Sequence, residues 1–531
     1  MKKQYMERTG VSLVPLLMLI FMALSTASTA QQEILDGVLR IKVTESLSAQ
    51  LETAALDGSE GAVLLTGIAS IDRVNEAYQV RGLRRVFRHG GKFENKHRQH
   101  GLHLWYEVSM DRSVSVLDAV AAFGDIEEID FSEAVLKKIV VGSNSPDYGP
   151  KPVVPEEYTN TMAPLPGAPD DPFLGDQWHY NNTGQSGGTP GADISLFQAW
   201  GIETGSPDVI VAVTDGGIQV DHPDIADNMW VNTGEIPGNG IDDDGNGFVD
   251  DINGYGFGDN TGDIAPDPHG THVGGTVAAV TNNGVGVAGV AGGSGIGDGA
   301  RLMSCAAFGA VDIGGFAETY IYAADMGAVI SQNSWGYTSP GVFEQSVLDA
   351  IDYFIAEAGK DSLGNQVGPM NGGIVIFAAG NDNQDADWYP GFYSPTLTVS
   401  GLTHDDTKAY YTNFGTWVDI AAPGGETISA NQEGVLSTLN NDQYGFFQGT
   451  SMACPHVSGL AALIISQYGG TGFSPTVLRD RLLSTTDDVD GLNPGFEGEL
   501  GGRINAFAAL QSDDGEAPFP VTDLTALDVE I

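Results

Sequence analysis

The sequence has almost no cysteine and no long hydrophobic run after its first 30 residues. Its two cysteines, Cys305 and Cys454, exclude a framework of several disulfides, and any bridge would have to join that one pair. We favour the alternative that both are small buried side chains. No run of 18 consecutive apolar residues occurs after residue 30, so we expect no membrane-spanning helix.

Basic residues are also scarce, and they are unevenly placed. The chain has 23 Lys and Arg against 70 Asp and Glu, a formal net charge of −47. Residues 1–150 hold 16 basic and 19 acidic residues, whereas residues 151–531 hold seven and 51. So acidic a region is a poor partner for nucleic acid or an anionic membrane. The acidity provides either solubility and salt tolerance or ligands for calcium.

Residues 1–30 have the features of a secretory signal peptide. Lys2, Lys3 and Arg8 give a basic start, residues 11–24 are an apolar core, and Ser28 to Ala30 supply small residues for a cleavage site. We therefore expect an exported, extracellular protein.

Two domains are predicted to follow. Residues 31–150 form a small α/β domain, in which strands within 102–110 and 126–141 flank a helix at 115–124. The stretch 142–171 is rich in Pro, Gly, Ser and Asn, and within it we assign 151–171 as an exposed linker open to cleavage.

Residues 172–512 alternate short apolar strands with helix-like stretches. The strands at 208–215, 327–336 and 372–381 are continuous apolar runs, typical of a parallel sheet buried on both faces. We predict a three-layer α/β sandwich. We interpret residues 513–531 as a linker and the first strand of a truncated β-sandwich module, with a disordered tail as the alternative.

Three chemically suggestive residues lie at element boundaries of this larger domain. Asp215 ends a strand, His269 begins a helix, and Ser451 precedes a long small-and-apolar run that we predict to be a buried helix. A serine hydroxyl becomes a good nucleophile when a histidine takes its proton and a buried acid orients that histidine. The structural alternatives are a helix cap for Ser451 and a strand-end carboxylate bound to backbone for Asp215.

The segments around these residues resemble a known family. DGGIQVDHPD (215–224), HGTHVGGT (269–276) and GTSMACPH (449–456) are similar, in this order, to the signature stretches of the subtilisin-like serine proteases, the subtilases. The resemblance covers about residues 171–512. It implies Asp215 as the orienting acid, His269 as the general base and Ser451 as the nucleophile. It also implies that Asn381 donates to the oxyanion, together with the backbone N–H of Ser451.

The resemblance also implies where a peptide substrate binds. Ser334, Trp335 and Gly336 match the segment whose backbone pairs with an extended peptide. Ala379 and Gly380 belong to the wall of the pocket for the side chain before the scissile bond. Near its rim, Trp388 favours apolar side chains whereas Asp382 and Asp387 favour basic ones, and the sequence does not decide between them. We interpret His222 and His456, each beside a proline within a motif, as structural.

Two calcium sites are predicted. Asp242, Asp244, Asn246 and Asp250 alternate oxygen ligands in the loop 238–254, as in the first half of an EF-hand, although Asn253 stands where a glutamate would be needed. An ordinary acidic turn is the alternative. The family resemblance implies a second site at Asp224 and Asn283, which Asp171 completes.

The sequence therefore favours a secreted, self-maturing, monomeric serine endopeptidase acting on polypeptides. Residues 31–150 would be its propeptide, which assists folding, blocks the cleft until it is removed, and pairs its basic residues with the acidic domain. The competing hypothesis is a secreted, calcium-stabilised binding protein on an inactive protease scaffold; the complete set of Asp215, His269, Asn381 and Ser451 favours the enzyme. An α/β-hydrolase esterase is excluded because residues 449–453 lack its Gly-x-Ser-x-Gly elbow and the acid, histidine and serine follow a different order.

Overall fold

The computed structural model describes the chain except for residues 1–33, 53–62, 143–148, 154–167, 310–314 and 512–531. The predicted signal peptide and the predicted C-terminal strand therefore lie outside the described residues, as do residues 154–167 of the predicted linker.

The first domain is a four-stranded antiparallel sheet, and three helices contribute side chains to the core on one of its faces. Its strand order is β2-β3-β1-β4. The bounds are β1 Ile34–Val43, α2 Glu45–Leu51, α3 Ala69–Tyr78, β2 Val80–Arg85, α4 Glu94–Gln99, β3 Trp105–Met110, α5 Val116–Gly124 and β4 Ile129–Leu136. The helix expected at 115–124 is confirmed as α5.

Strand β1 shows how the sheet divides its two faces. Leu39 and Ile41 point into a core shared with α3 and α5. The alternate residues Arg40 and Lys42 point the other way, where they contact Ser346 and Asp349 of the second domain. The period of two along the strand thus gives one face to the domain's own core and the other to a partner domain.

The second domain is built on an eight-stranded sheet, and the strand pairs within it are all parallel. The order is β17-β14-β13-β12-β10-β7-β9-β8. The strands are β7 Ile210–Asp215, β8 Gly254–Gly256, β9 Arg301–Ala306, β10 Ile330–Asn333, β12 Ile374–Ala378, β13 Leu397–Leu402, β14 Ile420–Pro423 and β17 Gly502–Arg503.

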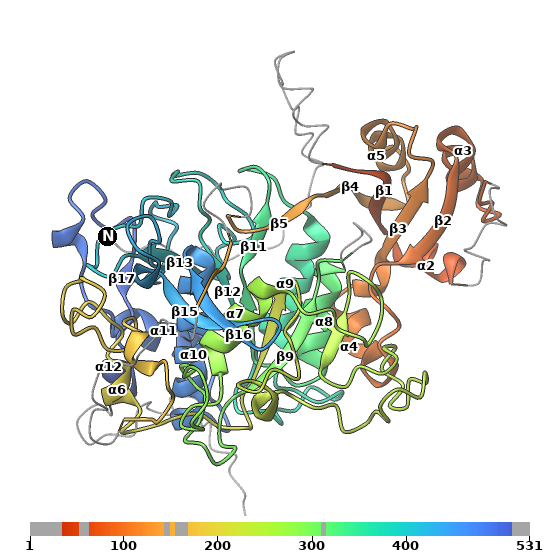
Figure 1. The fold of residues 1–531 in the computed structure, drawn as a ribbon. Helices are drawn as coiled ribbons and strands as arrows, with labels where there is room; N and C mark the ends of the chain where they lie inside the picture. Colours follow the sequence, from red (N-terminus) through yellow and green to blue (C-terminus); the bar gives the residue numbers. More distant parts are fainter. Residues whose placement is uncertain (1–33, 53–62, 143–148, 154–167, 310–314, 512–531) are drawn as a thin grey trace, which may run out of the picture.

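Helices cover both faces of this sheet, which confirms the predicted three-layer sandwich (Figure 1). Val211 and Val213 pack with helices on one face, and Ala212 between them packs with helices on the other. The first face carries α6 Leu196–Ala199, α7 Pro268–Ala278, α10 Thr450–Tyr468, α11 Pro475–Ser484 and α12 Ala506–Leu510; the second carries α8 Phe316–Asp325 and α9 Gln345–Glu357. Burial on both faces explains why the strands are continuous apolar runs.

Two small sheets complete the fold. Strand β5 (Lys138–Val140) follows the first domain and pairs antiparallel with β11 (Trp335–Tyr337) of the second, as Figure 1 shows. The other joins β15 Val435–Leu439, β16 Gln443–Phe447 and β6 Lys151–Pro152. Short 3₁₀ turns occur at Gly91–Phe93, Leu102–Leu104, Leu174–Asp176, Ala226–Asn228, Asn431–Glu433 and Asp490–Leu492.

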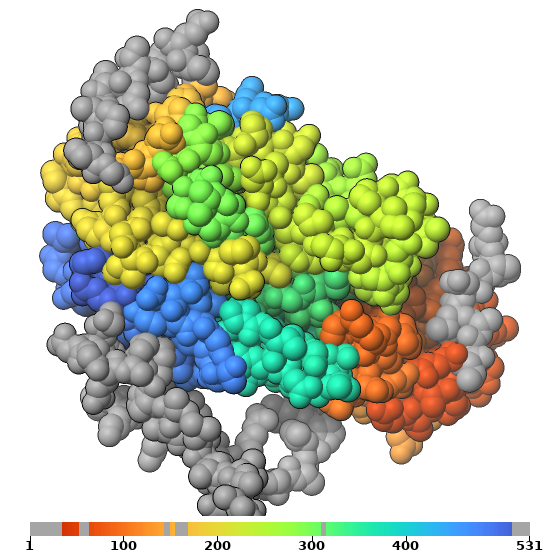
Figure 2. Space-filling model, turned by 90° about the horizontal axis from the view of Figure 1, so that it is seen from below, coloured from red at the N-terminus to blue at the C-terminus, as the bar shows by residue number. Residues whose placement is uncertain are grey.

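The first domain lies against the helices α8 and α9 of the second (Figure 2). Three of its basic residues form ion pairs across this boundary: Lys42 with Asp349 at 2.6 Å, Arg88 with Glu318 at 3.3 Å, and Lys96 with Glu357 at 3.5 Å. The expected pairing of the basic domain with the acidic one is thus confirmed at these positions.

Both cysteines are free and buried, as predicted. Cys305 on β9 and Cys454 on α10 belong to the cores on opposite faces of the large sheet, and burial raises the pKa of each thiol. Among the described residues, no helix has the length and apolar character needed to cross a bilayer.

Candidate active site

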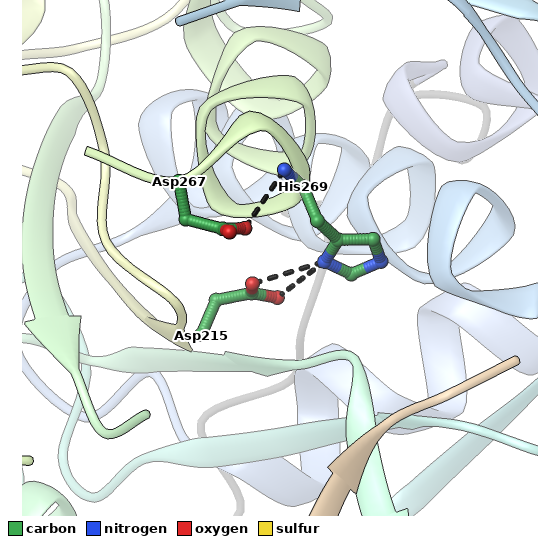
Figure 3. A group of neighbouring side chains, drawn as sticks. All are labelled: Asp215, Asp267 and His269. Carbon is green, nitrogen blue, oxygen red and sulfur yellow. Dashed lines mark hydrogen bonds and ion pairs between the residues drawn. The ribbon is translucent and has the colours of Figure 1, made fainter. Parts of the chain in front are cut away.

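Asp215 and His269 form a buried acid–histidine pair. Strand β7 ends at Asp215, and His269 stands in the first turn of α7, so the two side chains meet at the carboxyl edge of the sheet (Figure 3). The imidazole Nδ1 lies 2.9 and 3.0 Å from the two carboxylate oxygens. Burial alone would lower the pKa of His269, but the Asp215 carboxylate outweighs it and the pKa is raised. With Nδ1–H donating to Asp215, the neutral ring keeps its lone pair on Nε2.

Asp267 is a second carboxylate at this pair, and sequence reasoning missed it. It is the N-cap of α7, and its Oδ1 accepts from the backbone N–H groups of His269 at 2.8 Å and Gly270 at 3.2 Å (Figure 3). Pro268 occupies the first helical position. An Asp-Pro pair directly before a histidine is a local helix-start signal that would have predicted this cap. The cap fixes the backbone that carries His269.

Ser451 lies in the first turn of α10 and is 1% exposed. Its carbonyl would normally accept from the N–H of residue 455, but Pro455 has none. The Ser334 hydroxyl donates to that carbonyl instead, at 3.0 Å. Gly449, just before the helix, has φ +141°, a conformation that favours glycine. The predicted buried helix is confirmed, since every residue from Thr450 to Ile465 is buried.

Asn381 follows β12 and is oriented by the start of α10. Its Oδ1 accepts from the backbone N–H of Thr450 at 2.9 Å and from the Thr450 hydroxyl at 2.8 Å. These bonds fix which end of the amide is the oxygen, so Nδ2 is free to donate on the other side. It points at the carbonyl oxygen of Val141, 3.3 Å away.

The Val141 carbonyl oxygen contacts both of these candidate residues. The Ser451 hydroxyl is also 3.3 Å from this oxygen. The backbone N–H of Val141 donates to the Ser334 carbonyl at 3.1 Å and continues the β5–β11 pairing. Ser451 and Asn381 therefore converge on one carbonyl. Of the acid–histidine pair, His269 stands on α7, which packs against the helix α10 that carries Ser451.

Four of the five residues predicted to bind substrate line one cavity of about 280 Å³ next to Val141. Trp335 and Gly336 form one side, and Ala379 and Gly380 another. Ser334 does not line the cavity; its carbonyl accepts from the backbone N–H of Val141. Further lining residues are Ile139, Val141, Gly142, Tyr337, Ala378, Asn381, Asp382, Trp388, Tyr389 and Gly391. Of the predicted rim residues, Trp388 and Asp382 line this cavity and Asp387 does not.

His222 and His456 have structural contacts, as expected. The His222 ring lies 3.2 Å from the Gln443 carbonyl and accepts from the backbone N–H of Asp224 at 3.1 Å. His456 lies 2.7 Å from the Met452 carbonyl and 2.8 Å from the ring of His179. Burial lowers the pKa of His456 to about 4, so it stays neutral.

The three residues of one predicted calcium site come together. Asn283 Nδ2 donates to Asp224 at 2.9 Å, and the backbone N–H groups of Asn282 and Asn283 donate to Asp171 at 2.8 and 3.3 Å. Burial raises the pKa of Asp224 to about 8 and that of Asp171 to about 6, and each carboxylate has an acidic neighbour. The two buried carboxylates fit a hard cation such as calcium. The Asn283 amide turns its nitrogen to Asp224, and its oxygen accepts from the backbone N–H of Val285 at 2.8 Å.

The second predicted site is arranged differently from the sequence pattern. Asp242 and Asp244 gather with Glu235, whose carboxylate lies within 4.8 Å of theirs. Asp250 faces elsewhere and accepts from the backbone N–H groups of Asn239 and Gly240 at 3.1 and 2.9 Å.

The amide of Asn246 donates to Asp244 and to the buried Asp251. Glu235 was missed because it stands before the loop, outside the alternating ligand pattern.

Comparison with known proteins identifies the family. The model of the subtilase family matches residues 206–501. The chain is 31% identical over 316 residues to the thermophilic serine proteinase of Bacillus sp. (strain AK1), covering 59% of this chain and 64% of that protein. It is 31% identical over 329 residues to thermitase of Thermoactinomyces vulgaris, covering 60% of this chain and 94% of thermitase.

A solved structure shares the fold at low identity. Fervidolysin from Fervidobacterium pennivorans matches with a TM-score of 0.57 and 20% identity, over 91% of this chain and 62% of that one. The chain spans only 53% to 64% of the length of several of the curated relatives that it matches. The family match covers more than half of this chain and includes Asp215, His269, Asn381 and Ser451. The chain belongs to the subtilase family of serine proteases.

Proposed function

We propose that this chain is the precursor of a secreted serine endopeptidase, and that the first bond it cuts is its own Val141–Gly142 bond. The observation that carries the proposal is the Val141 carbonyl oxygen, which lies 3.3 Å from both the Ser451 hydroxyl and the Asn381 amide. Secretion is supported by the signal-like composition of residues 1–30.

The proposed chemistry assigns one role to each residue. His269 Nε2 takes the proton of the Ser451 hydroxyl while Asp215 holds Nδ1–H, and the Ser451 oxygen forms a bond to the Val141 carbonyl carbon. The negative charge that develops on the carbonyl oxygen is stabilised by Asn381 Nδ2. The second donor is the Ser451 N–H, at the positive end of α10.

The tetrahedral intermediate then loses its amine. The C–N bond to Gly142 breaks as the imidazolium of His269 donates its proton to the departing nitrogen, which leaves an ester between Val141 and Ser451. A water molecule, deprotonated by His269, attacks that ester and releases the Val141 carboxylate and the free serine. A polypeptide substrate presented in the same way would follow the same steps.

The same contacts support an inhibitory role for residues 31–141 after the cut. Residues 138–141 occupy the edge of β11 that a substrate would need, and the four-stranded sheet holds them there through α8 and α9. Until this segment dissociates, a substrate cannot pair with β11.

Calcium is the proposed cofactor and has a structural role. The ligand sets are Asp171, Asp224 and Asn283 at one site, and Glu235, Asp242 and Asp244 at the other. Neither set contains a residue of the proposed triad. The ion would neutralise buried carboxylates and join the segments that carry them.

The decisive experiment compares two serine variants of α10 in a protease-free expression host. Ser451→Ala should accumulate with residues 31–141 attached, while the unaltered chain yields a new N-terminus at Gly142 by mass spectrometry. Ser458→Ala is the matched control, because Ser458 is buried in the same helix but bonds the Cys454 carbonyl at 3.3 Å. A Gly142 N-terminus in purified Ser451→Ala would refute self-cleavage.

A further inference from the structure

The side chain of Lys138 is buried in the second domain, four residues before the proposed scissile bond. Counted back from that bond, Val141 is the first residue and Lys138 the fourth, and Lys138 pairs with Tyr337 of β11. Its side chain is only 4% exposed. The ammonium lies 5.6 Å from the ring centres of both Phe316 and Tyr337, a distance at which an aromatic ring attracts a cation.

Glu344 receives that ammonium group. The two side chains form an ion pair, and the Glu344 side chain is fully buried at 0% exposure. Its Oε1 also accepts from the backbone N–H of Leu136 at 2.9 Å, and its Oε2 accepts from the Tyr337 hydroxyl at 3.3 Å. Apart from Tyr337, these partners belong to the segment that the first cut would release.

Among the described residues of the second domain, no Lys or Arg forms an ion pair with Glu344 that could replace the one with Lys138. The ion pairs that its basic residues form with carboxylates lie elsewhere: Lys360 with Glu357, Arg479 with Asp419, and Arg503 with Asp406 and Asp487. Glu344 also precedes α9, whose N-terminal N–H groups favour a negative charge. Removal of the propeptide would therefore leave an anionic side chain beside an aromatic-walled groove.

We propose that Glu344, with Phe316 and Tyr337, forms an acidic subsite that selects a Lys or Arg four residues before the scissile bond of a polypeptide substrate. The inference rests on the proposed endopeptidase function and adds the substrate class of that site. A substrate strand can pair with β11 in the same way as β5. The side chain four residues before its scissile bond then lies in this subsite. A cationic group restores the partner of Glu344, a neutral one leaves the carboxylate unpaired, and an acidic one adds repulsion.

The test uses enzyme that has matured from the full-length chain, together with three peptide p-nitroanilides. They share Ile-Val-Val before the reporter, as at 139–141, and carry Lys, norleucine or Glu at the fourth position. Norleucine matches the length of the lysine stem without its charge. Because hydrogen bonds to charged groups contribute strongly, kcat/KM for the Lys peptide should exceed that for the norleucine peptide about 10- to 100-fold, with the Glu peptide lower still.

Variants assign the preference to Glu344. In Glu344→Gln the Lys-to-norleucine ratio should fall to about one. In Asp349→Asn it should be kept, because Asp349 lies on the next turn of α9 and contacts Lys42 and Trp105 rather than Lys138. The substrate series on the unaltered enzyme remains decisive if Glu344→Gln fails to mature.

The possible failures are distinguishable. Equal hydrolysis of the Lys and norleucine peptides by an active enzyme overturns this inference and leaves the proposed endopeptidase intact. A Lys preference that persists in Glu344→Gln also overturns it. If the chain hydrolyses none of the peptides and leaves its own Val141–Gly142 bond uncut, it is the proposed function that fails.

Discussion

At the scale of single residues, the proposed mechanism makes the acid–histidine pair the source of the pH dependence of activity. General-base catalysis needs neutral His269, and Asp215 raises the pKa of that imidazole above its ordinary value of 6.5 despite burial. Because the folded-state pKa is raised, protonated His269 stabilises the fold below about pH 6.5, and this contribution is lost as pH rises through the raised pKa. We expect activity to depend on pH in the opposite sense, and to increase as pH rises through the raised pKa of His269.

We expect kcat/KM to increase with pH through a midpoint above 6.5. Asp215→Asn should move the midpoint down and lower kcat by roughly 10³- to 10⁴-fold, because the imidazole loses both its charge partner and its fixed tautomer. Asp267→Asn is the matched control: Asn still caps a helix, and Asp267 raises the pKa of His269 by less than Asp215 does. The measurement is a pH–rate profile for all three proteins. A profile that stays flat down to pH 5 would argue against a histidine base.

Some candidate site residues lie in a recognisable local sequence pattern, whereas others depend on contacts between distant parts of the chain. The segments around Asp215, His269, Asn381 and Ser451 carry local patterns, so these positions could be predicted. Glu344 could not be predicted, because its proposed role depends on the ion pair with Lys138, about 200 residues away, and only the fold brings the two together. Asp250 is part of the calcium-loop pattern, yet it bonds backbone N–H groups outside the carboxylate cluster.

At the scale of elements, strand positions followed from the sequence but their pairings did not. The apolar runs at 208–215 and 372–381 became β7 and β12, each starting two residues later than expected. The expected strand within 126–141 is two strands, and β5 leaves the sheet of β4 to pair with β11. Periodicity identifies a strand but carries no information about which distant edge it joins.

The N-terminus of α9 makes a second contact between the two domains that the sequence did not predict. Glu133 on β4 accepts from the backbone N–H groups of Gln345 at 2.6 Å and Ser346 at 3.2 Å, and from the Ser346 hydroxyl at 2.6 Å. The first domain thus caps a helix of the second, satisfying N–H groups that would otherwise need water. A helix cap of this kind contributes about 1 kcal/mol.

We therefore expect Glu133→Ala to shorten the delay between self-cleavage and the appearance of activity. Loss of the cap weakens the hold of the cleaved segment on α9 by roughly five-fold, as about 1 kcal/mol implies. Progress curves of peptide hydrolysis after cleavage at Gly142 give the delay. Asp130→Ala, an exposed residue on the same strand, is the control. An unchanged delay in Glu133→Ala would mean that the cap does not hold the segment in place.

At the scale of the whole molecule, charge is the dominant feature. Residues 151–531 carry 51 acidic and seven basic side chains, so this part of the chain repels itself. The first domain offsets some of this repulsion through Lys42, Arg88 and Lys96, and the proposed release of that domain would end those contacts. In the proposed mature enzyme we expect calcium at the buried Asp171–Asp224 pair to supply positive charge in their place.

Chelation should accordingly lower the melting temperature of a proteolytically silent sample, Ser451→Ala, after its first domain is removed by an added protease. A ligand that binds only the folded state stabilises it by about 2.7 kcal/mol at a hundredfold excess over Kd. For a domain of about 340 residues, with an unfolding entropy of about 2.1 cal/mol/K per residue, that corresponds to a drop of about 4 °C. In the same background, Asp224→Asn should lose most of this response, because it removes one of the two buried carboxylates. Asp221→Asn, three residues earlier and exposed, should keep it. Calorimetry with and without chelator measures all three, and an unmoved melting curve in the parent sample would remove the case for calcium at both acidic clusters.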